Sequence, residues 1–86
     1  MENANNPRAL VYKGCAEMEL NKIEEAINTF QQLLAQHNDY KDMANWYLAL
    51  CYLKKGDEAE VKNRLELVTA DDKPYYDKAQ LLLKEL

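Results

Sequence analysis

The chain has 86 residues, the length of one small domain, because domains usually contain ~100 to 150 residues. Its 15 acidic and 11 basic side chains give a net charge of −4 without a basic cluster, which argues against binding to nucleic acid or to an anionic membrane. The longest apolar run, residues 46–53, is much shorter than the ~20 residues of a helical membrane span. We therefore expect a soluble domain with no nucleic-acid partner and no membrane insertion of this segment.

Residues 1–8 lack the basic start and apolar stretch of a secretory signal. Two origins stay open, a cytoplasmic protein and a soluble domain cut from a longer anchored protein. Cys15 and Cys51 are too few for a disulfide scaffold and lie within helical patterns. We expect two free thiols that pack as small apolar groups.

The first half of the chain predicts two helices. Asn6 is a good capping residue and Pro7 is tolerated at the first helical position, so a helix should begin there and run to about Leu20. Asn21 tolerates the left-handed conformation that ends many helices. A second helix follows, with apolar side chains spaced by three and four at Ile23, Ala26, Ile27, Phe30, Leu33 and Leu34.

The second half predicts three more helices. The third opens between Asp39 and Asp42 and closes at Gly56. Asp57 and Glu60 resemble a capping box for a fourth helix, whose apolar positions are Val61, Leu65 and Val68. The Asp-Asp-Lys-Pro stretch at 71–74 ends that helix and is expected to cap a fifth. The apolar stripe of the fifth helix is Tyr75, Ala79, Leu82, Leu83 and Leu86.

The chain repeats itself with a period of 35 residues and no gaps. The shift places Phe30 on Leu65, and it also aligns the turn residues Asn21 and Gly56, which a shared helical periodicity would not do. Further matches are Ala9 with Ala44 and Ala79, Tyr12 with Tyr47 and Leu82, Ala16 with Cys51 and Leu86, Met18 with Leu53, Ala26 with Val61, and Leu33 with Val68. The period indicates two helix pairs and the opening helix of a third.

This pattern resembles the tetratricopeptide repeat family, whose units of about 34 residues are antiparallel helix pairs. The residues that carry the resemblance are Leu48, Ala49, Tyr52, Gly56 and Asp57 in the second unit, and Gly14, Ala26, Phe30 and Leu33 in the first. The resemblance implies an all-α, right-handed superhelical array of five antiparallel helices. It implies a single domain over 1–86, with repeat one at 7–38, repeat two at 42–70 and a capping helix at 73–86.

Four positions depart from the family's pattern. Lys13 and Glu17 stand where a leucine and an aromatic residue are expected, Asn38 where proline often closes the unit, and Val61 where alanine dominates. Lys13 and Glu17 are four residues apart on one helical face and can pair, which suits a first helix with no repeat before it.

The third helix is apolar on all sides over residues 43–53, apart from Asn45, and must be covered from several directions. The resemblance implies that Leu48, Ala49 and Tyr52 face the partner helix of their own unit. It also implies that a second set of residues, on this helix and at the equivalent positions of its neighbours, lines the concave groove in which family members hold peptides. The candidate partner-binding residues are Trp46, Leu50 and Leu53, with Val11, Cys15 and Met18 one repeat back, and Leu81 with Glu85 one repeat forward.

Two interpretations of these residues stay open. They form closed core beneath the fifth helix, or an exposed groove that binds an apolar peptide or an amphipathic helix. The second makes the chain a protein-protein interaction module. The alternative function is a structural or self-associating scaffold segment of a longer protein, including a homodimer, because arrays usually need about three repeats for stability.

No set of residues supports catalysis, a metal or a cofactor. His37, the single histidine, is expected at a helix end, and Cys15 and Cys51 lie on different helices, which gives neither a metal ligand set nor an activated nucleophile. Two isolated glycines cannot build a phosphate-binding loop. We predict a non-catalytic protein with no cofactor.

Overall fold

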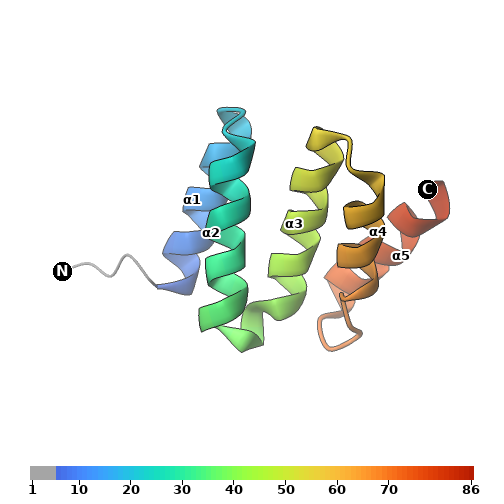
Figure 1. The fold of residues 1–86 in the computed structure, drawn as a ribbon. Helices are drawn as coiled ribbons and strands as arrows, with labels where there is room; N and C mark the ends of the chain where they lie inside the picture. Colours follow the sequence, from blue (N-terminus) through green and yellow to red (C-terminus); the bar gives the residue numbers. More distant parts are fainter. Residues whose placement is uncertain (1–5) are drawn as a thin grey trace.

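A computed structural model describes residues 6–86. The helices are α1 (Pro7–Glu19), α2 (Ile23–Gln36), α3 (Lys41–Lys55), α4 (Glu58–Glu66) and α5 (Lys73–Glu85), with a short 3-10 helix η1 (Asn38–Tyr40) leading into α3. Successive helices run in opposite directions; α1 to α4 stand side by side, and α5 lies tilted behind α4 (Figure 1). The structure shows no strand in residues 6–86, and the prediction of an all-α array of five helices is confirmed.

Local signals set the ends of α1 and α3. The Asn6 side chain accepts hydrogen bonds from the backbone N–H groups of Arg8 (2.9 Å) and Ala9 (3.3 Å), which have no partner within the helix. Asn21 and Gly56 adopt the left-handed conformation, with φ of 63° and 80°. These two residues are equivalent under the 35-residue shift, so both helix pairs turn by the same device.

Of two predicted helix caps, the one at α4 is partly correct and the one at α5 is wrong. Asp57 accepts from the Glu60 backbone N–H at 3.2 Å, but the Glu60 carboxylate lies 3.6 Å from Arg64 Nε, so the reciprocal half of a capping box is replaced by an ion pair along α4. The prediction that Asp71 and Asp72 cap α5 is wrong. Asp71 bonds Lys41 of α3, and Asp72, although it is the N-cap residue, makes no side-chain cap bond.

The first core cluster lies between α1, α2 and α3. Phe30 is fully buried, and its ring approaches α1 so closely that a Cβ at Gly14 would overlap the end of the ring. Gly14 is therefore required by the ring opposite it. The buried members are Leu10, Ala26, Ile27, Phe30, Leu33, Ala44, Leu48 and Cys51.

A second core cluster joins α3, α4 and α5, with Ala49, Val61, Leu65, Val68 and Ala79 as its buried members. The expectation that Leu48 faces the partner helix of its own unit is wrong, because Leu48 belongs to the first cluster. Ala49 belongs to the second, and Tyr52 packs against both. Adjacent residues differ by ~100° around a helix, so α3, which contacts α2 and α4, gives one residue to each side.

Glu17 has a partner other than the one expected. The Thr29 hydroxyl of α2 donates to the Glu17 carboxylate at 2.7 Å, whereas the sequence suggested a pair with Lys13. Thr29 is itself buried, so a charged acceptor on α1 satisfies its hydroxyl within the first helix pair. The division into repeats at 7–38 and 42–70 and a capping helix at 73–86 stays a prediction.

Candidate functional site

A hollow that we call the α3–α5 groove lies between α3 and α5. Its volume is about 540 Å³, within the ~300 to 1,000 Å³ typical of ligand sites. The groove is lined by Trp46, Leu50 and Leu53 from α3 and by Lys78, Leu81, Leu82 and Glu85 from α5. Of the eight predicted partner-binding residues, five meet here: Trp46, Leu50, Leu53, Leu81 and Glu85.

The α3–α5 groove is open to solvent. Leu53 is 45% exposed and Leu81 is 63% exposed, although both are large apolar side chains on its walls. The fifth helix therefore forms the second wall of the groove instead of closing over it. An open apolar hollow of this kind has the geometry of an interaction surface.

The other predicted site residues lie in two smaller hollows between α1 and α3. Val11 lines a hollow of about 240 Å³ with Arg8, Tyr12, Tyr40 and Met43, which we call the Tyr40 hollow. Cys15 and Met18 line a hollow of about 230 Å³ with Glu19, Tyr47 and Lys54, which we call the Cys15 hollow. The single trough expected from the sequence is thus divided into three hollows.

We attribute the division between α1 and α3 to Tyr47. Its ring stacks on Phe30, with centroids 5.1 Å apart and planes 9° from parallel, and its centroid lies 6.3 Å from that of Tyr75. Burial, with Tyr75 and Cys15 close by, raises the pKa of Tyr47 well above its ordinary value, so the phenol stays neutral. At the equivalent position α5 carries the smaller Leu82, which lines the larger groove.

Sequence reasoning missed Lys78 and Leu82 as groove residues. Lys78 lies three residues before Leu81 and seven before Glu85, so helical spacing places all three on one face of α5. That spacing could have identified Lys78. Its Nζ lies 5.4 Å from the centroid of the Tyr75 ring, a cation–π contact.

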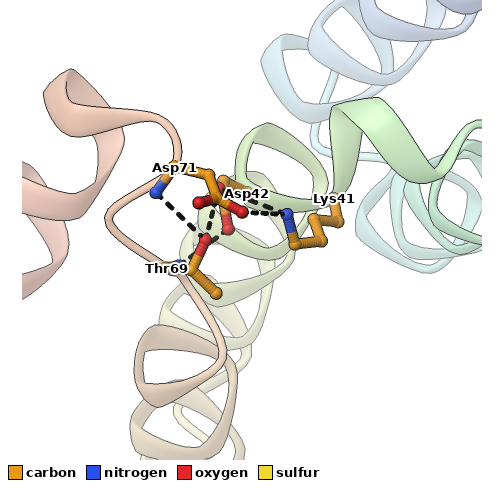
Figure 2. A network of polar contacts seen from close by, with 4 residues as sticks. All are labelled: Lys41, Asp42, Thr69 and Asp71. Atoms are coloured by element: carbon orange, nitrogen blue, oxygen red, sulfur yellow. Dashed lines mark hydrogen bonds and ion pairs between the residues drawn. The ribbon is translucent and has the colours of Figure 1, made fainter.

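Four polar residues, which we call the Lys41 network, connect the start of α3 to the loop before α5 (Figure 2). The buried carboxylate of Asp42 accepts from the backbone N–H of Thr69 at 2.7 Å and from its hydroxyl at 2.9 Å. The Thr69 hydroxyl also accepts from the backbone N–H of Asp71 at 3.3 Å, and Lys41 Nζ lies 3.0 Å from the Asp71 carboxylate. This network holds the 67–72 loop against α3 and so helps to position the α5 wall of the groove.

The Lys41 ammonium lowers the pKa of Asp71 below its ordinary value, because the hydrogen bond and the charge both favour the carboxylate. The same bond raises the pKa of Lys41. Both groups are therefore charged at neutral pH.

The two thiols lie in surroundings that disfavour their reactive form. Burial raises the pKa of Cys51 to about 11 and also raises the pKa of Cys15. Residues 6–86 contain no group of three histidine, cysteine, aspartate or glutamate side chains placed to hold a metal ion. Within the same range, no helix has the length and apolar character needed to cross a membrane.

A family model described as the tetratricopeptide repeat matches residues 17–86, which is most of the chain. The chain belongs to the tetratricopeptide repeat family. Tetratricopeptide repeats generally mediate protein-protein interactions and are typically non-catalytic. Searches of curated proteins and of solved structures returned no match.

Proposed function

We propose that this tetratricopeptide repeat domain is a non-catalytic module that binds an apolar peptide or an amphipathic helix of a partner protein in the α3–α5 groove. The observation that supports this most directly is the open hollow between two helices, with Leu53 and Leu81 exposed on its opposite walls. Large apolar side chains left in water at a concave site gain free energy when a partner covers them.

The composition of the groove fits a few anchoring side chains better than a polar tail. Trp46, Leu50 and Leu53 offer only indole and aliphatic surface from α3, and the charges come from α5 alone. Aromatic residues in partly enclosed hollows are frequent hot spots of binding energy. A ligand with apolar side chains spaced by three and four would place them along this surface.

The experiment compares two glutamine substitutions at leucines of similar exposure. Leu81, 63% exposed, lies in the groove, and Leu20, 67% exposed, is the C-cap residue of α1 outside it. Binding of a fluorescein-labelled amphipathic peptide of about 16 residues, rich in leucine, is measured by anisotropy. Leu81→Gln should weaken binding by about tenfold, whereas Leu20→Gln should leave it unchanged.

Absence of binding by the wild-type domain at millimolar peptide would contradict the proposal, as would equal weakening by both substitutions. Circular dichroism checks that both variants keep the helical fold. Because both positions are exposed, we expect each substitution to change the free energy of unfolding by less than about 0.5 kcal/mol.

The alternative function is self-association of a scaffold segment, in which a second copy covers exposed apolar surface. Tyr12 of α1, 73% exposed, and Leu20 at the end of that helix, 67% exposed, favour this possibility because they lie outside the α3–α5 groove. Sedimentation equilibrium distinguishes self-association from binding of a peptide in the groove. Self-association through α1 predicts a dimer that Leu20→Gln weakens and Leu81→Gln does not, whereas peptide binding in the groove predicts a monomer.

A further inference from the structure

We propose that the α3–α5 groove selects its ligand by the order of charges along it, and that the preferred ligand is an amphipathic helix antiparallel to α5. Such a helix carries a basic residue in its N-terminal half and an acidic residue about seven positions later. This inference rests on the proposed function, because it names the class of ligand that the same groove binds.

The charges that line the groove lie on one wall only. The α3 wall contributes Trp46, Leu50 and Leu53, while α5 contributes Lys78 from its middle and Glu85 from its last position. Among residues 6–86, Glu85 has no hydrogen-bond or ion-pair partner, and the Lys78 ammonium has a cation–π contact with Tyr75 but no ion pair. Both charged groups are therefore available to a ligand at the edge of an apolar surface.

The spacing of the two charges fits a helix. Lys78 and Glu85 are seven residues apart, which corresponds to about 10.5 Å, or two turns, along α5. A ligand helix in the groove can therefore place an opposite charge beside each of them with two residues that are also seven apart. The apolar positions between them would meet Leu81 and Leu82 on the wall that carries the charges. This is the arrangement in which charged residues beside an apolar seam set the orientation of a partner helix.

Helix dipoles favour the antiparallel direction. The helices α3 and α5 run in the same general direction (Figure 1), so the negative ends of both dipoles lie toward the Glu85 end of the groove. A ligand helix whose N-terminus lies at that end places its positive pole, and a basic side chain, beside Glu85. Its acidic residue then lies near Lys78, at the other end of the groove.

The test uses two leucine-rich amphipathic peptides of about 16 residues with the same composition. The first has a lysine seven positions before a glutamate at the edge of the apolar face, and the second has the two exchanged. Binding is followed by the fluorescence of Trp46, the single tryptophan, at low salt. The wild-type domain should bind the first peptide about three- to tenfold more tightly, and the preference should shrink near 1 M salt as the Debye length falls to ~3 Å.

The decisive variant is Lys78→Glu combined with Glu85→Lys, which keeps the net charge and should invert the preference between the peptides. The matched control, Lys62→Glu with Glu66→Lys, exchanges two exposed charges of α4 away from the groove and should leave the preference unchanged. Because the same two peptides are measured with the wild type and with both variants, a difference in helicity between the peptides cannot produce an inversion of the preference.

Equal binding of the two peptides by the wild-type domain would overturn the inference and leave the proposed function intact. Preference for the second peptide, or a preference that the double variant does not invert, would also overturn it. If neither peptide binds, the proposed function itself fails.

Discussion

The space between α1 and α3 and the space between α3 and α5 are built from equivalent positions, yet only the second is a continuous groove. Between α1 and α3 the hollows measure about 240 and 230 Å³, whereas the α3–α5 groove measures about 540 Å³. Tyr47 stacks on Phe30 and lines one hollow of the first space, and Leu82 stands at the equivalent position of α5 and lines the second. We attribute the difference between the two spaces to the side chain at this one position, a tyrosine on α3 and a leucine on α5.

The two helix pairs also differ in how their helices approach each other. In the first, Gly14 of α1 meets the ring of Phe30 from α2, and no Cβ fits between them. In the second, Ala49 and Leu65 stand at the equivalent positions, and both are fully buried. The first pair combines the smaller Gly14 with the larger Phe30, and the second combines the larger Ala49 with the smaller Leu65. The two changes in size compensate, so both interfaces stay filled.

The largest expected effect comes from making the first space resemble the second. Tyr47→Leu removes the stack on Phe30 and leaves a cavity between α1 and α3, so we expect a loss of about 2 to 3 kcal/mol in the free energy of unfolding. Urea denaturation followed by circular dichroism measures it. Tyr12→Leu is the same substitution at the equivalent position of α1, where the ring is 73% exposed, and should cost less than about 0.5 kcal/mol. Equal costs would show that the ring of Tyr47 does not fill that space.

The reverse change should close the groove. Leu82→Tyr places an aromatic ring beside Trp46 and Leu50, and we expect it to weaken binding of an amphipathic peptide by about tenfold, with a change in stability below about 1.5 kcal/mol. Leu67→Tyr, at a leucine that is 48% exposed and outside the groove, is the control for an added ring. Unchanged peptide affinity in Leu82→Tyr would contradict the role that we give to this position.

The smallest effect concerns the loop that positions α5. The pKa of Asp71 lies below its ordinary value of 3.8, so its pair with Lys41 stabilises the fold fully above that pH and is lost as the pH falls below it. The pKa of Lys41 lies above 10.5, so the same pair is lost again as the pH rises beyond that value. Asp71 is exposed and Lys41 only partly buried, so water screens the pair and we expect a small change in the free energy of unfolding.

Melting temperatures of the wild type and of Asp71→Asn, measured from about pH 2 to pH 5, test this point. The difference between the two proteins should be present at pH 5 and vanish at the acid end. A difference that is constant across the range would show that the charge of Asp71 contributes nothing through its pair with Lys41.

The sequence predicted the helices well because their ends depend on neighbours. Asn6 with Pro7, Asn21, and Gly56 each act within a few residues, and the structure places a helix end at each of them. Five of the seven groove residues were also predicted, because their positions follow from the repeat and from helical spacing.

What the sequence could not predict depends on contacts between residues far apart in the chain. Asp42 and Thr69 are 27 residues apart, and nothing near Asp71 indicates that its partner is Lys41. The stack of Tyr47 on Phe30, to which we attribute the division between the two smaller hollows, depends in the same way on how α3 packs against α2. Alignment by the repeat treats Tyr47 and Leu82 as equivalent, and their difference in size matters only once the helices are placed.

The most direct test of the account is a map of amide chemical shifts in the ¹⁵N-labelled domain as an amphipathic peptide is added. We predict that the largest shifts fall on the residues of the α3–α5 groove, centred on Trp46, Leu50 and Leu81, with little change at Tyr12 and Val11 on α1. Shifts centred on α1, or spread evenly over the domain, would contradict the claim that the space between α3 and α5 is the binding site.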